Sequence, residues 1–551
     1  MLQMRAFLSY FMRHACALTI IFASLHAQQA HALIIGEIVV NSKLGEPLLA
    51  YVPISPETPY EKITNSCLSL IKTGDTDVQG RPNLSAARLK LEGNRRKGLR
   101  IRISTATPIN VPSLTIRLKA NCVPNGLVIR EFFLDLEPAS NPAPNPIEAT
   151  SASAERTGLS AIQKPELNGS VRVGYFSSSR KLDGEKHLGT GSLWLNATQN
   201  FGDSNSLVAS GWIRNDESFK PSGRLQELQE GYLNFSTGNF DYRIGKQIIV
   251  WGRADRLNPT DNLTPRNYTL LTPEDYDQRT GTLAAKITYN LADSSLTGIW
   301  LPKMNPNVFP VAPTPGVFFT EQIPHANQFA IKFDRTGRNV DWSTSYYSGL
   351  DLNPDVVIGA TTPLGTNLIF QHNSIRVLGM DAATVIGRYG LRAEGAYTWT
   401  ESTGPNDFLV KKPFFYMVMG GDRTFFDYVN VNIQYFLRHV TNYSDPQEIG
   451  DPFQRSVAIY GAVLSNQIER FQDGISARIS DEWLNETLQA EIATVAVFGP
   501  ANYSIRAKMI YAFTDNIKGT SGFDIYRGDS NTFFGLWRDM SLIFGEIKYS
   551  F

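Results

Sequence analysis

The stretch Tyr503–Phe513, YSIRAKMIYAF, alternates apolar and polar side chains along its whole length. One side of the alternation carries Tyr503, Ile505, Ala507, Met509, Tyr511 and Phe513. The other side carries Ser504, Arg506 and Lys508. A period of two residues is the pattern of a β-strand that separates an apolar from an aqueous environment. The stretch therefore predicts a strand with two chemically different faces.

The same alternation recurs in other parts of the C-terminal two thirds of the chain. The clearest examples are Leu391–Thr400 (LRAEGAYTWT), Val431–Val440 (VNIQYFLRHV) and Gly545–Phe551 (GEIKYSF). A soluble β-sandwich would give the same alternation. Three features favour a membrane barrel instead: runs of about 10 residues, aromatic residues near the strand ends, and a terminal Phe551 that resembles the C-terminal signal of outer-membrane barrels.

Lipid accommodates a polypeptide backbone only in helices or in closed barrels. The region after the N-terminal segment has no apolar run long enough for a transmembrane helix. Residues 168–551 would supply about 16 strands, with 14 to 18 allowed, at roughly 24 residues per strand and loop. The expected fold is all-β, a transmembrane antiparallel β-barrel preceded by a small periplasmic β-sandwich domain. A barrel of this size leaves an aqueous channel, which favours transport.

The first 32 residues have the features of a signal peptide. Arg5 and Arg13 precede the apolar run ACALTIIFASL, and Ala30-His31-Ala32 offers a small-residue cleavage site. The chain is therefore expected to leave the cytoplasm. Cys67 and Cys122 would then form one disulfide in an oxidising compartment, which would stabilise the fold by roughly 4 kcal/mol on the chain-entropy model. The alternative is two buried thiols.

Residues 33–137 contain short alternating runs bounded by turn residues, namely GEIVV, LRIRIS, LTIRLKA and LVIREFFLDL. These runs predict a small β-sandwich. Gly36-Glu37-Ile38, the run Ser42–Leu48 and the run Leu127–Leu136 resemble the N-terminal periplasmic domain of FimV, a protein of pilus assembly and cell-pole organisation. The peptidoglycan-binding modules and acidic tails of that family are absent from this sequence, so the resemblance implies a periplasmic β-domain and no pilus function.

A linker is expected at residues 138–166, with the barrel at residues 167–551. The run from Pro138 to Pro165, PASNPAPNPIEATSASAERTGLSAIQKP, is rich in Pro, Ala and Ser and poor in aromatic residues. Such a segment cannot bury enough apolar area to fold. The two folded parts are therefore expected to be joined by a flexible tether.

If apolar strand positions face lipid, their alternates face the lumen. The predicted inward cations are Arg172, Arg214, Arg243, Lys286, Lys332, Arg392, Arg438, Arg478, Arg506, Lys508 and Lys548. The predicted inward anions are Asp241, Asp334, Asp341, Glu394, Glu491 and Glu546. The excess of cations favours a weak preference for anions. The alternative is that these charges pair with one another and only keep water in the bore.

A long charged segment, Ile249–Arg279, interrupts the strands. It lies between the strand patterns FDYRIGKQIIVW and GTLAAKITYNL, so it connects neighbouring strands and is too long for a turn. Its charged residues are Arg253, Asp255, Arg256, Asp261, Arg266, Glu274, Asp275, Asp277 and Arg279. We expect the segment to fold into the lumen as a constriction, against the wall residues Arg243, Arg392, Glu394 and Arg506. The alternative is an extracellular loop, or one braced on the barrel rim.

The start of this segment carries the pattern R-x-G-x-Q-x-x-x-W-G, formed by Arg243, Gly245, Gln247, Trp251 and Gly252, before an Asn-Pro-rich loop. The pattern resembles segments of poorly characterised porin-like outer-membrane families. The resemblance implies a passive or gated channel in the outer membrane for small or polymeric solutes. The expected partners are outer-membrane lipid and lipopolysaccharide, the solute, the barrel-assembly machinery and a periplasmic or cell-wall partner of the N-terminal domain.

Two other classes of function are alternatives to the channel. The barrel could anchor the FimV-like domain for structural or assembly roles, or it could be an outer-membrane hydrolase. The histidines after the signal peptide, His187, His325, His372 and His439, are widely scattered, and no G-x-S-x-G or H-E-x-x-H motif occurs. We therefore expect no enzyme, no catalytic residues, no metal site and no cofactor. Because Lys+Arg and Asp+Glu are equal at 52 each, no nucleic-acid partner is expected.

Overall fold

The computed structural model describes residues 34–135 and 165–551, each with gaps. The gaps in the first range are 36–37, 41, 43–45, 56–62, 71–83, 85–86, 95–97, 110–112 and 122–126. Those in the second range are 183, 202–204, 219–225, 292, 312–313, 338–339, 403, 427, 485–486 and 500–501. The predicted signal peptide, nearly all of the predicted linker and Cys122 lie outside the described residues, while Cys67 is disulfide-bonded.

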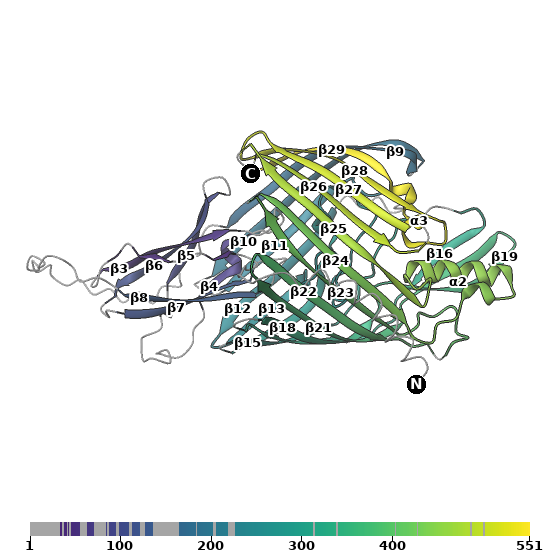
Figure 1. The fold of residues 1–551 in the computed structure, drawn as a ribbon, viewed down its shortest axis with the longest axis horizontal. Helices are drawn as coiled ribbons and strands as arrows, with labels where there is room; N and C mark the ends of the chain where they lie inside the picture. Colours follow the sequence, from purple (N-terminus) through teal and green to yellow (C-terminus); the bar gives the residue numbers. More distant parts are fainter. Residues whose placement is uncertain are drawn as a thin grey trace, which may run out of the picture.

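The N-terminal domain consists of two antiparallel sheets, as the alternating runs predict (Figure 1). One sheet contains β1 (Ile34–Ile35), β2 (Val39–Val40), β3 (Pro47–Ser55), β5 (Arg88–Asn94) and β6 (Gly98–Pro108). The other contains β4 (Leu68–Leu70), β7 (Ser113–Asn121) and β8 (Leu127–Asp135), with the 3-10 helix η1 (Asn65–Cys67) before β4. Alternate apolar residues such as Val52, Ile101 and Ile116 are fully buried in one core.

Residues 166–550 form a closed antiparallel barrel of eighteen strands, at the upper end of the predicted range. In chain order they are β9 (Glu166–Leu182), β10 (Glu185–Phe201), β11 (Asn205–Arg214), β12 (Gln226–Thr237), β13 (Phe240–Gln247), β14 (Thr282–Asn290), β15 (Ser294–Leu301), β17 (Gln328–Arg335), β18 (Val340–Leu350), β21 (Ser374–Ile386), β22 (Tyr389–Trp399), β23 (Phe414–Phe425), β24 (Val429–Val440), β25 (Phe471–Trp483), β26 (Leu488–Val497), β27 (Asn502–Ala512), β28 (Ile517–Gly528) and β29 (Leu542–Ser550). The ring closes where β29 pairs with β9.

The outer surface of the barrel is apolar and its inner surface is polar. On β9, exposed Val171 and Val173 flank Arg172, which is only 4% exposed. On β21, exposed Leu378 and Met380 flank Gly379. The predicted register is confirmed on the strands that carry the predicted inward charges, because their exposed large apolar residues have the opposite parity. On β12, exposed Leu228 and Leu233 differ in parity because the pairing with β11 shifts register between them. A wide exposed apolar surface of this kind is unfavourable in water and suits acyl chains.

The predicted set of inward anions was incomplete. Asp381 on β21, Asp422 on β23 and Asp524 on β28 also have inward parity. Asp381 and Asp524 are buried, and Asp422 pairs with inward Arg392 at 3.2 Å. Glu227 and Glu230 on β12 also face the lumen, because Glu227 pairs with inward Arg214 at 2.8 Å and Glu230 accepts from Ile248 N. At least five carboxylates therefore join the predicted inward anions, so the strand charges of the lumen are closer to balance than the sequence count indicated.

Short turns lie at one end of the barrel and long insertions at the other. At the end near the N-terminal domain, here called the domain end, two residues join β12 to β13 and two join β21 to β22. Figure 1 also places the C-terminus at this end. The opposite end, here called the loop end, carries the long connections after β13, β15, β18, β22 and β24. No helix among the described residues is long and apolar enough to cross a membrane.

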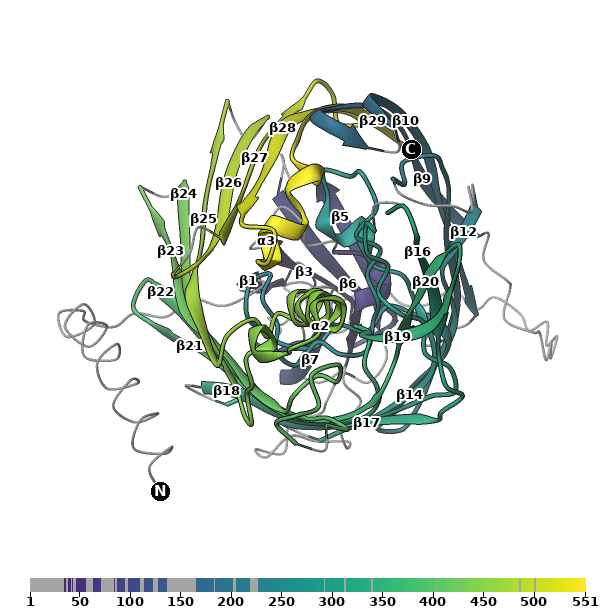
Figure 2. The same cartoon turned by 90° about the vertical axis from the view of Figure 1, so that its right-hand side faces the viewer.

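A small accessory unit lies at the loop end. The strands β16 (Val317–Gln322), β19 (Asp355–Thr362) and β20 (Gly365–Gln371) form a separate sheet, and helix α2 (Pro452–Leu464) packs on it. Helix α3 (Phe533–Leu536) and the 3-10 helices η3 (Pro446–Glu448) and η4 (Arg538–Met540) complete this region. Viewed along the barrel, α2 is seen end-on and lies inside the outline of the ring rather than in the wall (Figure 2).

Candidate functional site

The segment of residues 249–279 turns inward directly after β13. The side chain of Gln247 is fully buried, and its Nε2 donates to the carbonyl oxygen of Ala284 at 2.9 Å. The next amides leave the sheet, because Ile248 N donates to Glu230 Oε1 at 2.8 Å and Ile249 N donates to Thr264 Oγ1 at 2.8 Å. Side-chain oxygens thus replace strand carbonyl oxygens as the acceptors for these amides. The ladder of β13 therefore ends at Gln247, and the chain enters the barrel.

The first part of the 249–279 segment rests on an apolar patch of the wall. Ile249, Trp251 and Leu263 are at most 7% exposed. They belong to one buried cluster with Ala284, Ile299, Leu301, Ala330, Tyr347, Ile375, Val377 and Ala396. The segment is therefore held by apolar burial as well as by charge. The charged residues from which the inward path was predicted give no indication of this apolar contribution.

Glu394 on β22 is the acceptor at the centre of the segment. Its Oε2 accepts from the backbone amides of Arg253 at 3.0 Å and Ala254 at 3.1 Å. Its Oε1 accepts from the amide and the hydroxyl of Thr260 at 2.8 and 2.7 Å. A carboxylate that accepts several well-placed donors is a strong anchor. Glu394 therefore fixes both sides of the bend that runs from Arg253 to Thr260.

Gly252 explains part of the sequence pattern before the bend. Its φ of +97° is unfavourable for other residues, and a Cβ at this position would lie 2.4 Å from Glu394 Oε2. Gly245, earlier in the same pattern, has φ of +134° and approaches the carbonyl oxygen of Gly231 closely. Both glycines are thus required by the path of the chain, one at the wall and one at the carboxylate.

The segment then reaches strands on the far side of the barrel. Asp255 exchanges two hydrogen bonds with the side-chain amide of Gln434 on β24, at 3.0 and 2.7 Å, and its carboxylate lies 2.9 Å from Arg478 Nε on β25. Arg256 pairs with Glu491 on β26 at 2.8 Å. A chain that leaves β13 and contacts β24, β25 and β26 crosses the interior of an eighteen-stranded ring. These contacts place this part of the segment inside the barrel, along the predicted inward path.

The end of the segment, which includes the 3-10 helix η2 (Asp275–Gln278), contacts a third part of the wall. Asp277 pairs with Arg172 on β9, and Glu274 lies 3.2 Å from Lys548 on β29. Arg172 and Lys548 are directly opposite in the β9–β29 pairing. Two like charges opposite one another destabilise a sheet. The two segment carboxylates neutralise this cation pair.

Asp275 is held in the same way by cations of the wall and of the segment. It pairs with Arg506 on β27, and Arg256 lies 3.7 Å away. Burial by itself raises the pKa of the Asp275 carboxyl, but the guanidinium groups of Arg506 and Arg256 outweigh burial and bring the pKa down to about 2. The carboxylate is therefore ionised throughout the physiological pH range.

The remaining predicted site residues divide into two groups. Arg253 pairs with Asp381 at 2.5 Å, and Arg279 pairs with Asp261 at 2.6 Å, with Arg266 3.9 Å from the same carboxylate. Arg243 and Arg392 lie elsewhere on the wall. Arg243 donates to Asn234 and lies over the Tyr232 ring, and Arg392 pairs with Asp422.

Asp381 and Gln434 are among the wall residues that hold the segment and were not predicted as site residues. Both lie on strands whose alternation the sequence shows. Asp381 lies between Met380 and Ala382 in IRVLGMDAATVI, and Gln434 lies between Ile433 and Tyr435. Extending the period of two along every strand would have placed Asp381 inside the barrel. No local signal indicates that either residue contacts residues more than a hundred positions earlier in the chain.

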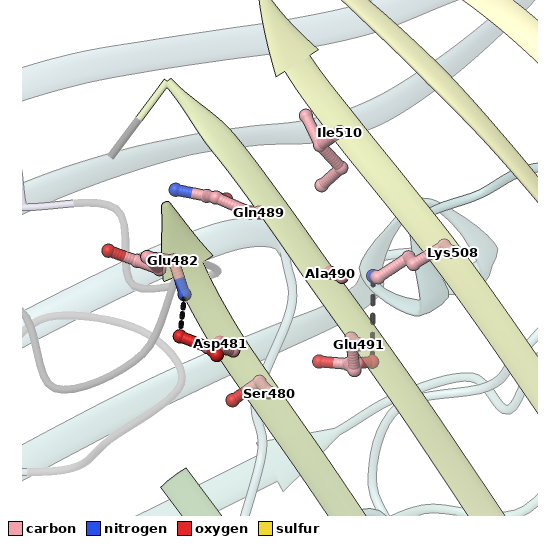
Figure 3. Close-up of a pocket in the computed structure, with 8 residues that line it drawn as sticks. All are labelled: Ser480, Asp481, Glu482, Gln489, Ala490, Glu491, Lys508 and Ile510. Atoms are coloured by element: carbon pink, nitrogen blue, oxygen red, sulfur yellow. Dashed lines mark hydrogen bonds and ion pairs between the residues drawn. The ribbon is translucent and has the colours of Figure 1, made fainter. Parts of the chain in front are cut away.

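A small pocket in the wall lies beside these contacts, between β25, β26 and β27 (Figure 3). Its lining includes Ser480, Gln489, Glu491 and Lys508, and Lys508 Nζ is 3.8 Å from Glu491 Oε1. Glu491 therefore receives Lys508 from the wall and Arg256 from the segment. The site brings together opposite charges at short range, which suits holding a segment and lining a polar bore.

The described histidines do not form a catalytic arrangement. His372 is fully buried, with Nδ1 2.7 Å from the carbonyl oxygen of Asp351, and His439 stacks on Phe471. His187 Nδ1 is 3.0 Å from Ser177 Oγ and 2.8 Å from the hydroxyl of Tyr175. Acyl transfer also needs a group that orients the base and donors for an oxyanion. Around His187, the side-chain hydrogen bonds among the described residues are to the serine and the tyrosine.

Comparisons with known proteins separate the two parts of the chain. Over the barrel, the fold is similar to that of a BenF-like porin from Pseudomonas fluorescens Pf-5, with 9% identity, 72% of this chain and 99% of that chain covered, and a TM-score of 0.44. It is similar to OccD3 (OpdP) of Pseudomonas aeruginosa, with 11% identity, coverage of 72% and 92%, and a TM-score of 0.43. It is also similar to OccK8 (OprE) of Pseudomonas aeruginosa, with 11% identity, coverage of 71% and 98%, and a TM-score of 0.42.

At the level of sequence, no curated protein matches the chain. One family profile does match part of it, and the match falls on the N-terminal domain, where the sequence pattern had indicated the resemblance. Residues 33–139 match the FimV N-terminal Ig-like domain family.

Proposed function

We propose that the protein is an outer-membrane channel for small polar solutes, with the 249–279 segment as its constriction. The observation that carries the proposal is the path of this segment. It starts on β13, is anchored by Glu394, and pairs with Glu491, Arg506 and Arg172 across the ring. A charged chain across a wide polar lumen narrows the bore and presents both signs of charge to a solute.

The proposed orientation has the domain end in the periplasm and the loop end outside the cell. Short periplasmic turns and long extracellular loops are the rule for bacterial outer-membrane barrels. In this arrangement the outer apolar surface contacts lipid and lipopolysaccharide, and the N-terminal domain lies in the periplasm. The barrel-assembly machinery is the proposed partner for insertion, because the ring-closing strand β29 alternates and carries the aromatic residue Tyr549, followed by Phe551.

A weak anion preference remains part of the proposal, on narrower grounds than the sequence count. The inward carboxylates of β12, β21, β23 and β28 offset most of the excess of cations that the sequence count gave, so the preference rests on one local cation pair. Arg243 and Lys286 lie directly opposite each other on β13 and β14, both with inward parity, and Arg243 Nε donates to the side-chain oxygen of Asn234 at 2.8 Å. A half-exposed cation pair of this kind raises the local concentration of anions.

The constriction is tested by Glu394→Gln in the full-length protein, reconstituted in planar bilayers. The neutral amide has one acceptor oxygen in place of a carboxylate, so amides of Arg253 and Ala254 lose their partner. Hydrogen bonds to charged groups contribute about 1.5–3 kcal/mol each, so the bend should detach and single-channel conductance should rise. Asp422→Asn is the matched control, because it removes an inward carboxylate that pairs with Arg392 of the wall.

Conductance that rises in Glu394→Gln and stays at the wild-type value in Asp422→Asn supports the constriction. Equal conductance in all three proteins contradicts it. The absence of any conductance in the wild type, in a protein that inserts and resists unfolding in detergent, contradicts the channel itself. The reversal potential across a salt gradient tests charge preference in the same recordings, and cation selectivity would overturn the proposed preference for anions.

A further inference from the structure

Lys119 of the N-terminal domain is buried although its side chain points away from the core of that domain. Along β7, Leu118 and Ala120 point into the domain core and are fully buried. Lys119 lies between them and therefore faces the other side of the sheet. A lysine on an open sheet face normally keeps its ammonium group in water. Lys119 is nevertheless only 9% exposed.

The barrel accounts for this burial. Lys119 Nζ donates to Asp241 Oδ2 at 2.7 Å and to Asn290 Oδ1 at 3.2 Å. Asp241 is near the start of β13, and Asn290 is the last residue of β14. Both therefore lie at the domain end, in the wall of the lumen. The lysine reaches from the N-terminal domain into the mouth of the barrel.

The acceptor for this lysine is built by the barrel itself. Asp241 also accepts from Ser236 Oγ at 2.7 Å and from Asn290 Nδ2 at 2.7 Å. These two donors fix the carboxylate between β12, β13 and β14 with one oxygen shared with the incoming ammonium group. A carboxylate oriented by neutral donors at the rim of a pore is a suitable receptor for a single cation.

Docking of Lys119 changes the balance of charge at the entrance of the barrel. Arg243 is two residues further into the bore than Asp241 on the same face of β13, and Lys286 lies opposite Arg243. Lys286 interacts electrostatically with Arg243, Lys119 and Asp241. The docked lysine therefore occupies a carboxylate that would otherwise balance this cation pair. It also adds a third positive charge at the entrance.

We propose that the domain-end mouth of the barrel is a docking surface for the chain's own N-terminal domain, with Lys119 as the latch. The docked domain covers part of the entrance and acts as a movable cap. A single ion pair at a partly exposed carboxylate is weak and sensitive to salt, so the cap opens readily. Because both partners belong to one chain, the effective concentration is high and closing is favoured again. The gating role rests on the proposed channel function.

Docking is tested without any measurement of transport. A water-soluble carbodiimide joins an amine to a carboxylate only when the two are in contact, by forming an amide and releasing a urea. Treatment of the full-length protein in detergent, followed by peptide mass analysis, is expected to give a Lys119–Asp241 cross-link. Lys119→Arg keeps the charge and removes the reactive amine, so the cross-link should vanish. Exposed Lys90 on β5 is the internal control and should give no cross-link to the barrel.

Gating is tested by conductance in the same full-length protein. Lys119→Glu places two carboxylates together, so the cap should be released and conductance should rise above the wild-type value. The charge swap Lys119→Glu with Asp241→Lys restores an ion pair and should return conductance toward the wild type. Lys90→Glu changes the domain charge equally and should have no effect.

Each result has one meaning. Absence of the Lys119–Asp241 cross-link overturns the docking surface, whatever the conductance shows. A cross-link combined with identical conductance in the wild type and in Lys119→Glu overturns the cap. A conducting Lys119→Glu variant that the swap does not restore also overturns the latch. If no variant conducts but the cross-link forms, docking stands and the proposed channel function is the part that fails.

Discussion

At the scale of single residues, the contact between Gly252 and Glu394 carries the most constraint in the lumen. Gly252 combines a positive φ with a carboxylate oxygen where its Cβ would be. Glu394 in turn accepts from residues on both sides of the bend. Gly252 therefore lacks a side chain, and this leaves room for the Glu394 carboxylate that anchors the 249–279 segment. The pattern W-G before the Asn-Pro-rich loop has this physical cause.

Replacement of Gly252 by alanine should displace the segment from Glu394. The expected result is a larger or less steady single-channel conductance in a protein that still forms a heat-modifiable barrel. Gly298→Ala is the matched control, because Gly298 lies in a strand with open space around its Cβ position. Wild-type conductance in Gly252→Ala would show that the segment keeps its path without this close approach.

The carboxyl group of Asp216, just after β11, should make the charge selectivity of the channel depend on pH. Burial raises the pKa of Asp216 to about 6, although Arg214 lies 3.5 Å away and opposes the shift. For an acid with a raised pKa, the folded state binds more protons than the unfolded chain between about pH 4 and pH 6, so stability falls as pH rises through that window. Acidification from about pH 7 to pH 5 protonates the carboxyl, so the positive charge of Arg214 is no longer neutralised by Asp216.

The reversal potential should therefore shift toward anions on acidification, and Asp216→Asn should remove that part of the shift. The charged groups that act on this carboxyl are Arg214, Asp277 of the segment and Arg172 of β9. Recordings at both pH values in the wild type and the variant measure the difference. An equal shift in the two proteins would assign the pH response to other groups.

At the scale of elements, the strands are predictable from sequence and the accessory unit is not. The period of two places Arg506 inside the barrel and Met509 outside without knowledge of any partner strand. The strands β19 and β20 carry the short apolar runs Val356–Ile358 and Leu368–Phe370 instead, and β20 pairs with β16 on one side and with β19 on the other in a separate sheet. Pairing is decided by partners far apart in the chain, and a local pattern does not encode it.

Helix α2 was also missed, although its sequence carries a helix signal. Asp451 is the N-cap, its side chain accepts from the amide of Gln454, and Pro452 occupies the first turn. Val457 and Leu464 are buried on one face at helical spacing. The partners of the 249–279 segment are different in kind. Nothing near Arg256 in the sequence indicates Glu491 as its partner.

The accessory unit should unfold separately from the barrel. Leu464 is 2% exposed in a small core with Val356 and Leu368, and Leu464→Ala should cost about 2–5 kcal/mol there. The hydrogen-bonded ring of eighteen strands contains none of these residues. The variant should therefore become sensitive to protease at the loop end while the barrel keeps its resistance to detergent.

Phe453→Ala on the same helix is the control, because Phe453 is 43% exposed and its loss should change protease sensitivity little. Protease mapping of the membrane-embedded protein distinguishes the two. Loss of the barrel in Leu464→Ala would show that the accessory unit and the ring fold as one cooperative unit.

At the scale of the whole molecule, the two parts are joined by covalent continuity and by a small contact. Every strand of the ring lies between Glu166 and Ser550, and the sheets of the N-terminal domain contain no barrel strand. The domain has its own apolar core. Among the described residues, the Lys119 side chain links it to the barrel by hydrogen bonds to Asp241 and Asn290. Such a division favours independent folding of the barrel.

A protein with its signal peptide joined directly to residues 165–551 should therefore insert as a heat-modifiable barrel with wild-type thermal stability. Because β9 closes the ring with β29, removal of the preceding residues leaves every ladder hydrogen bond intact. Removal also exposes Asp241 at the mouth, so the conductance of this protein should match that of full-length Lys119→Glu. Truncation that begins after β9, at residue 185, is the opposite case. It deletes one of the eighteen strands, leaves the edges of β10 and β29 unpaired, and should abolish the barrel. Equal stability of the two truncations would show that ring closure through β9 does not hold the fold together.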